Sequence, residues 1–338
     1  MIAPADARSS LRRIARRYTC SKRAVFLILP TPFTASPDPG SVRPMKTLGL
    51  LSLFAIAFAA TPAAIAQSYS APLNSAGQPD LSGYWTHATA TTLERDPEFG
   101  DRLVMTAEEA EAASDEMAIG AEHRTSFLVA PANGQLPDLT PAAKAARADR
   151  LAAYPRGLGF QRGDHPESFT LAERCLRDYG SLLGPPMMPV GYNNNYQIIQ
   201  TNDYAIILVE MIHDARIIPL TTRHRTDVIR PWMGDSIGRY EGDTLVVETT
   251  NFKPNLAFRG APETITVIER FRRISDTQVL YSFDINEPGV FTAPIRGELA
   301  FNAMPGPVYE YACHEGNYSF PNQLLGHRLA EQTREADK

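Results

Sequence analysis

Two short polar segments of this chain carry the side chains best suited to proton transfer. The first is Glu210–Arg216 (EMIHDAR), which follows the apolar run Ile206–Val209, so that His213 and Arg216 come where a buried strand ends. An imidazole at a strand end could act as a general base, and a guanidinium could hold an anionic phenolate or carboxylate. The alternatives are a surface histidine in a turn and an arginine in a structural salt bridge.

The second segment is Tyr309–Tyr318 (YEYACHEGNY), in which His314 and Glu315 directly follow Cys313. An exported chain that loses its leader keeps Cys175 and Cys313, and two cysteines in such a chain predict one disulfide. The bond would hold His314 and Glu315 rigidly, which is one way to preorganise a catalytic site. The alternatives are a nucleophilic thiol and a strand end with exposed charges.

Groups that could surround a small ligand occur at two further places. The cluster Tyr192–Tyr196 (YNNNY) enters a strand, and its asparagines could form turns or hydrogen-bond a ligand. Trp232 could stack on an aromatic ring or pack in the core, and Asp235 fits either an Asx turn or a catalytic role. Arg223-His224-Arg225 is typical of a solvated loop. The predicted substrate-binding residues are Tyr192, Asn193, Asn194, Trp232 and Asp235.

Other reaction classes lack their motifs. The chain shows none of the metal-binding spacings HExxH, HxH or CxxC, so we predict neither a metal nor a cofactor. A metal site built from His213, His314 and a carboxylate is the open alternative. No Walker loop or dinucleotide fingerprint is present, and Gly234-Asp235-Ser236 lacks the second glycine of a nucleophile elbow. Phosphoryl transfer and hydride transfer are therefore not expected.

Short β-strands must position these residues. A turn at Gly242 separates Ile237–Tyr240 from Thr244–Thr249, and the alternation along this hairpin favours a barrel with a polar interior. Runs of this kind recur after Tyr192 and predict an antiparallel barrel or sandwich. The remaining runs are Tyr196–Gln200, Tyr204–Ile212, Ala215–Pro219, Thr264–Ile274, Gln278–Asn286, Ile295–Asn302 and Val308–His314.

Residues of about 100–180 have a different pattern. Thr106–Met117 begins with a capping box, Pro141–Ala153 begins with proline after Thr140, and Thr170–Asp178 forms a third short helical run that carries Cys175. This region is predicted to be a helical insertion or lid. No linker separates it from the strands, so residues 67–338 are expected to form a single domain.

The first 66 residues are expected to be absent from the mature protein. An apolar run after Met45-Lys46 ends at the small-x-small site Ala64-Ile65-Ala66, which is typical of a Sec signal peptide over 45–66. Residues 1–44 are expected to be a mis-annotated extension, and the mature protein to be periplasmic. The apolar run is too short for a stable membrane span. The remaining residues 67–338 carry 24 Lys or Arg and 36 Asp or Glu, and this net charge of −12 disfavours nucleic acid as a partner.

Gly83-Tyr84-Trp85 at the start of the first strand is similar to the Gly-x-Trp of lipocalin-like barrels, in which the tryptophan plugs one end. We therefore predict a mainly β fold: an antiparallel lipocalin-like (calycin-type) β-barrel with a helical N-terminal insertion or lid. The chain also resembles a large family of exported bacterial proteins. The motifs that carry this resemblance are PDLSGYW (79–85), ERCL (173–176), GYNNNYQIIQT (191–201), EMIHDARIIPL (210–220), WMGDSIGRYEGDTLVVETTNF (232–252) and YEYACHEGNY (309–318).

The resemblance implies a role in catabolism of plant-derived aromatics, including a lyase that releases formaldehyde from phenylcoumaran-type lignin dimers. We therefore expect a periplasmic, cofactor-independent carbon–carbon lyase that acts on a small aromatic substrate. Such a reaction needs a base, groups that stabilise an oxyanion and groups that pack the ring. We assign these roles to His213 or His314, to Arg216 and Asn194, and to Tyr192 and Trp232.

Two alternatives from other functional classes remain open. One is a non-catalytic, lipocalin-like carrier of a small molecule, for which the histidines would be dispensable. The other is a hydrolase of esters or glycosides, which two facing carboxylates such as Glu248 with Glu269 or Glu310 would favour. The sequence leaves the oligomeric state open.

Overall fold

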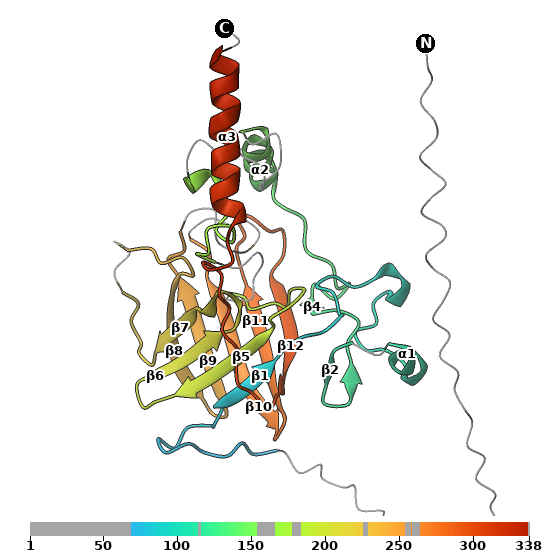
Figure 1. Ribbon diagram of the computed structural model, residues 1–338. Helices are drawn as coiled ribbons and strands as arrows, with labels where there is room; N and C mark the ends of the chain where they lie inside the picture. Colours follow the sequence, from blue (N-terminus) through green and yellow to red (C-terminus); the bar gives the residue numbers. More distant parts are fainter. Residues whose placement is uncertain are drawn as a thin grey trace, which may run out of the picture. The chain divides into compact units, whose positions relative to one another are not determined.

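The computed structural model describes residues 69–113, 116–153, 166–177, 184–225, 229–253, 258 and 264–336. The predicted signal peptide and the extension before it lie outside these residues. Within the described part the fold is mainly β, and its largest element is an antiparallel sheet of nine strands that nearly closes into a barrel (Figure 1).

The strand order around the barrel is β7-β6-β5-β1-β12-β11-β10-β9-β8, and β4 pairs with β12 off this path. Along this path, every strand except β1 has the strand before or after it in sequence as a neighbour. The small strands β2 and β3 form a separate pair. The bounds are β1 Gly83–Thr86, β2 Ala118–Ile119, β3 Glu122–His123, β4 Leu128–Ala130, β5 Asn195–Gln200, β6 Tyr204–Val209, β7 Ala215–Pro219, β8 Asp235–Glu241, β9 Thr244–Thr250, β10 Val267–Ser275, β11 Gln278–Ile285 and β12 Ile295–Ala303.

Large apolar side chains fill the barrel interior. The two-residue period of β9 turns Leu245 and Val247 inward, and both are buried. At the centre, the ring of Phe301 is stacked between Tyr196 and Tyr281, with centroid distances of 5.1 and 5.4 Å. The predicted polar interior is therefore wrong as a general description, because most inward positions form a packed apolar core.

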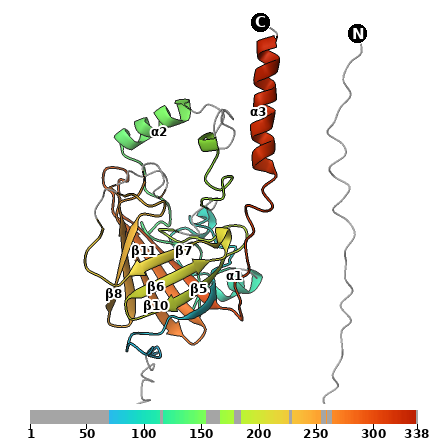
Figure 2. The ribbon, with the colours of Figure 1, turned by 60° about the vertical axis from the view of Figure 1, so that its left-hand side comes forward.

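An odd number of strands leaves one pair of neighbours that cannot be antiparallel. That pair is β7 and β8, which lie side by side (Figure 2) and share a parallel bridge between Leu220 and Gly238. Parallel neighbours require a crossover connection, and the separation between Pro219 at the end of β7 and Asp235 at the start of β8 is long enough for one. A Cβ added at Gly238 would lie 3.1 Å from side-chain atoms of Ile218 and Leu220, so glycine permits this close approach. We call the β7–β8 contact the seam.

Trp85 closes one end of the barrel. Its indole Nε1 donates to the Leu81 carbonyl at 2.9 Å, and the guanidinium of Arg273 lies 5.7 Å from its ring centroid. Beside it, Gln200 donates to the hydroxyl of Tyr240 and accepts the Leu81 amide at 2.6 Å. We call this the plugged end. At the other end, β1, β6, β9 and β11 finish and β5, β7, β8, β10 and β12 begin, and we call it the site end.

Helices and short turns complete the described part. The predicted capping box is confirmed: Thr106 accepts the amide of Glu109, whose side chain accepts the amide of Thr106, at the start of α1 (Ala107–Ala112). Helix α2 covers Pro141–Ala153, as predicted. Single 3₁₀ turns are η1 (Pro97–Phe99), η2 (Pro166–Ser168) and η3 (Met211–His213), and α3 covers Ser319–Ala336.

Four predicted elements differ from the structure. The helix predicted over Thr106–Met117 ends at Ala112, because Ala113, with φ of −96° and ψ of 89°, is not helical. The described part of Thr170–Asp178 forms turns, because Cys175 adopts a left-handed conformation with φ of 54°. Strand β6 ends at Val209 because Glu210, with φ of −61° and ψ of −46°, is helical, so the predicted strand does not continue to Ile212. Val308–His314 is irregular, and α3 was not predicted.

Candidate functional site

The predicted site residues lie on strand ends and connections at the site end of the barrel. Asn194 precedes β5, His213 connects β6 to β7, Arg216 is the second residue of β7, and Trp232 and Asp235 lead into β8. The antiparallel register places the start of β5, the end of β6 and the start of β7 together, because Tyr196 pairs with Val209 and Leu208 pairs with Ala215. The parallel bridge between Leu220 and Gly238 makes β8 the next strand after β7.

His213 is exposed on a strained turn. The backbone of Ile212 and His213 has φ of 62° and 47°, which is uncommon for residues other than glycine and rarest for a β-branched one. His213 Nδ1 lies 2.9 Å from the carbonyl oxygen of Tyr311. A carbonyl can only accept, so Nδ1 carries the proton and Nε2 of the neutral imidazole is the basic nitrogen.

The predicted disulfide between Cys175 and Cys313 is confirmed, with an S–S distance of 2.02 Å. It ties the turns near residue 175 to the C-terminal segment whose Tyr311 carbonyl contacts His213. His314 and Glu315 follow the bond in an exposed turn. The disulfide therefore lies close to two of the predicted catalytic histidines, and it removes Cys313 as a free nucleophile.

Arg216 points into the barrel and is paired with Glu269. Its Nη1 and Nη2 atoms donate to the two carboxylate oxygens at 3.0 and 2.5 Å, and the side chains are 2 % and 0 % exposed. Burial would lower the pKa of Arg216, but the charge and hydrogen bonds of Glu269 raise it above its usual value. The arginine is thus held as a cation in the interior by a partner that sequence reasoning considered only as a hydrolase carboxylate.

A second buried polar contact joins His87 to Tyr196 through the imidazole Nε2 and the phenol oxygen. Burial lowers the pKa of His87 to about 3, so its ring is neutral. His87 Nδ1 has no hydrogen-bond partner among the described residues. Sequence reasoning missed His87, although it follows Trp85 by two residues and therefore faces the same side of the sheet.

Asp235 is the centre of a polar cluster at the start of β8. Its carboxylate accepts from the backbone and Nε of Arg225 at 2.9 and 2.7 Å, and it lies 3.0 Å from His224 Nδ1. Burial would raise the pKa of Asp235, but the hydrogen bonds from Arg225 and His224 lower it. His224 Nε2 also lies 3.3 Å from Glu248. Arg223 and Arg225 are exposed, as predicted for a solvated loop, but the contacts of His224 and Arg225 with Asp235 fix the loop to the start of β8.

Two of the carboxylates considered for a hydrolase, Glu248 and Glu269, do not face each other, and the third, Glu310, is exposed. Glu269 faces the barrel interior, where it is opposite Val247, whereas Glu248 is opposite Ile268 on the outer face. The two therefore lie on opposite sides of the sheet and do not form the facing pair that glycoside hydrolysis needs.

The predicted substrate-binding residues have different surroundings. Asn194 is buried and makes two hydrogen bonds to the backbone of Val190, whereas Tyr192 is 52 % exposed. Asn193 adopts φ of 55°, which fits the turn that the asparagines favour. Lys253 Nζ lies 3.5 Å from the ring centroid of Trp232, a cation–π contact.

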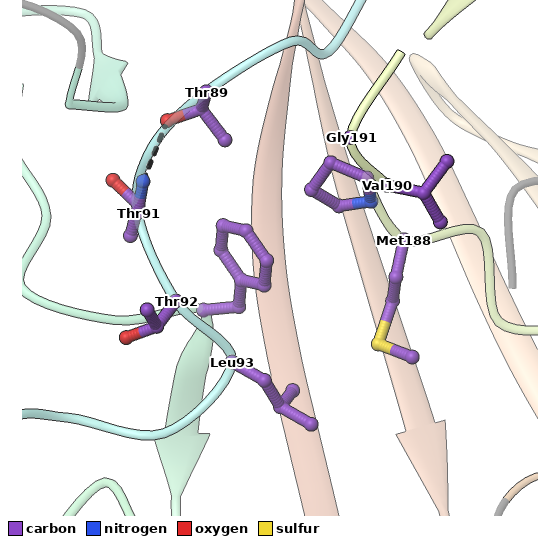
Figure 3. A pocket seen from close by; sticks show the side chains of 9 residues that line it. Thr89, Thr91, Thr92, Leu93, Met188, Val190 and Gly191 are labelled. Atoms are coloured by element: carbon purple, nitrogen blue, oxygen red, sulfur yellow. Dashed lines mark hydrogen bonds between the residues drawn. The ribbon is translucent and has the colours of Figure 1, made fainter. Parts of the chain in front are cut away.

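A cavity of about 420 Å³ lies beside the site end. Figure 3 shows its two walls: the segment that follows β1 forms one, and the segment that precedes β5 forms the other. The lining is mainly apolar, with threonine hydroxyls on one side. The lining residues are Thr89, Thr91, Thr92, Leu93, Phe127, Met188, Pro189, Val190 and Gly191.

A second cavity of about 500 Å³ shares Thr92 with the first. Its lining includes Asp96, Glu98, Glu109 and Glu116, but Arg102 already donates to both carboxylate oxygens of Glu109 at 2.8 and 2.7 Å. Thr91 donates to Glu116 and also accepts the Met117 amide at 2.8 Å. These contacts shape the wall between the cavities.

The described residues contain no group of three or more His, Cys, Asp or Glu side chains arranged to hold a metal ion. None of the helices in the same part of the chain has the length and apolar character required to cross a membrane. Comparisons with models of protein families, with curated proteins and with solved structures found no match to this chain.

Proposed function

We propose that this protein binds a small, largely apolar molecule in the 420 Å³ cavity at the site end of its barrel. The cavity is the observation that carries the proposal, because its volume falls in the range of small-molecule sites. Leu93, Phe127 and Met188 supply apolar surface, while threonine hydroxyls can orient a polar substituent. An aromatic compound with one or two oxygen groups matches this lining.

Two further features support a lipocalin-like, exported carrier or enzyme. Trp85 lies at one end of the barrel, which agrees with the tryptophan plug of the lipocalin-like barrels that Gly83-Tyr84-Trp85 resembles, and the cavity lies beside the other end. The Cys175–Cys313 bond is compatible with an oxidising compartment such as the periplasm. Export through the signal peptide over 45–66 remains part of the proposal.

Binding can be tested with 1-aminoanthracene, a neutral aromatic probe whose fluorescence rises in apolar surroundings. Titration of the wild type should give saturable binding. Leu93→Trp places a larger side chain in the cavity and should weaken binding at least about tenfold, which is a loss of about 1.4 kcal/mol. Leu73→Trp is the matched control, since Leu73 is 66 % exposed and lies before β1. Equal affinities for both variants would contradict the assignment of the cavity.

A second candidate function, a carbon–carbon lyase, is favoured by the geometry of His213. Its exposed imidazole has the basic nitrogen Nε2 set by the contact of Nδ1 with Tyr311. That nitrogen would take the proton of a substrate hydroxymethyl group. The O–H electrons would form the carbonyl of formaldehyde, and the breaking carbon–carbon bond would leave its electron pair on the benzylic carbon, where the aromatic ring delocalises the charge. That carbon would then take the proton back from the His213 imidazolium, so that the net change is loss of CH₂O.

The two functions differ in whether the bound compound is changed. Mass spectrometry of phenylcoumaran-type lignin dimers incubated with residues 67–338 should show loss of one CH₂O unit if the lyase proposal holds. Activity should then fall at least about 10²-fold in His213→Ala or His314→Ala with the fold retained. His327→Ala on α3 serves as the control histidine. Compounds that bind and return unchanged would leave the carrier as the function.

A further inference from the structure

The cavity wall formed by residues 188–191 is held from inside the barrel. Met187, which directly precedes this wall, is fully buried, and its amide donates to the hydroxyl of Tyr281 at 2.7 Å. The same hydroxyl donates to Glu269 Oε1 at 2.9 Å. One phenol oxygen therefore links the backbone of the cavity wall to a carboxylate in the barrel core.

The ion pair with Arg216 fixes the position of that carboxylate. Two parallel hydrogen bonds of 3.0 and 2.5 Å hold both oxygens of Glu269, so its orientation toward Tyr281 is determined. Burial raises the pKa of Tyr281 well above its usual value, which keeps the hydroxyl protonated as a donor. A buried ion pair seldom adds stability over apolar side chains of the same volume, so geometry is the better explanation for its presence.

Asn194 holds the same wall at a second point. Its side chain accepts the Val190 amide at 2.9 Å and donates to the Val190 carbonyl at 2.7 Å. Asn194 is itself buried, and its backbone carbonyl accepts a hydrogen bond from the His87 backbone amide at 3.2 Å. The wall between Met187 and Val190 is thus tied to the barrel at both ends.

We propose that Arg216, Glu269 and Tyr281 form a positioning device that sets the place of Met187 and, through it, the shape of the cavity wall. The residues would not contact the ligand. They would determine which apolar molecules fit by keeping the wall at a fixed distance from the opposite segment. This inference rests on the proposed function only for its ligand, since the contacts themselves are properties of the free protein.

The test compares two Tyr→Phe variants. Tyr281→Phe removes the hydroxyl that joins Met187 to Glu269, and it should weaken 1-aminoanthracene binding about fivefold to twentyfold. Tyr240→Phe is the matched control, because it removes a hydroxyl bonded to Gln200 at the plugged end. The control should bind the probe with wild-type affinity.

A second measurement does not depend on a ligand. Hydrogen exchange of peptides that cover residues 187–191 should be faster in Tyr281→Phe than in the wild type and unchanged in Tyr240→Phe. Wild-type exchange and affinity in Tyr281→Phe would overturn the positioning role. If the wild type does not bind the probe, the proposed function fails, and exchange alone decides this inference.

The double variant Arg216→Met/Glu269→Met replaces Tyr281→Phe if the latter does not fold. Its apolar side chains keep much of the volume of the ion pair while removing the acceptor of Tyr281, and exchanges of this kind are often tolerated. The same two readouts apply, with faster exchange at residues 187–191 as the expected result. Wild-type exchange in the double variant would likewise overturn the proposal.

Discussion

Burial of the His87 imidazole, which lowers its pKa to about 3 from an ordinary 6.5, makes the barrel sensitive to acid. Below pH 6.5 the unfolded chain binds a proton at this residue, whereas the folded protein does not until about pH 3. The unfolded state therefore binds more protons in this window, and stability falls as the pH decreases through it.

Between pH 6.5 and 3, the His87 proton should lower the free energy of unfolding of the wild type by about 4 kcal/mol, and we predict that His87→Gln abolishes this contribution. Urea unfolding of the wild type and the variant at several pH values gives the comparison. The variant lacks only this proton-binding group, so the acidic residues contribute equally to both curves. Parallel curves would show that His87 does not stay neutral in the folded protein.

The sequence identified candidate site residues that share a segment, but it did not identify the partners that contact them from other strands. His213 and Arg216 follow from the end of an apolar run, but their contacts are Tyr311 and Glu269, which are distant in sequence. One signal was available: in Val267–Phe271 the period of two places Glu269 on the same face as two apolar neighbours. A lone carboxylate on such a face requires a buried cation.

Among the elements, the seam is the weakest line of the barrel. Elsewhere each strand shares a ladder with both neighbours, whereas β7 and β8 share a single bridge between Leu220 and Gly238. Few backbone hydrogen bonds cross this line, so local opening there costs less free energy than separation of β10 from β11. We predict faster hydrogen exchange in peptides of β7 and β8 than in peptides of β10 and β11.

A bulky residue at Gly238 should widen the seam. Gly238→Val would place methyl groups against Ile218 and Leu220 and should lower stability by about 1–3 kcal/mol. Gly316→Val is the control, since an added Cβ there meets only the Ala312 carbonyl, at 3.7 Å. Thermal unfolding of both variants checks the difference, and equal melting temperatures would mean that the seam tolerates separation.

The odd number of strands could not be predicted from the individual strands and turns. The alternation and turns of 204–219 and 235–250 identify antiparallel hairpins, and those pairings are present. Local pattern does not determine which strands close the sheet, because that choice depends on where β1 inserts. β1 lies between β5 and β12, and only this insertion makes β7 and β8 parallel neighbours.

For the molecule as a whole, the Cys175–Cys313 bond is the longest-range covalent constraint in the described part, joining residues with a sequence separation of 138. Closing so long a loop restricts the unfolded chain. We predict that Cys175→Ala/Cys313→Ala lowers the free energy of unfolding by about 2–5 kcal/mol, measured with urea. Reductant should destabilise the wild type and leave the variant unchanged. A variant as stable as the wild type would show that the constraint acts little on the unfolded state.

The Arg216–Glu269 pair also affects which register the strands adopt during folding. The partners lie 53 residues apart on β7 and β10, and both must face inward for the bonds to form. If the register of either strand shifts by one residue, one partner turns outward and the other remains in the core as an unpaired charge. Removing one partner of a buried pair costs about 3–5 kcal/mol, so misaligned barrels are penalised before they can persist. The ion pair thus favours the correct strand register, because it forms only when both strands are aligned.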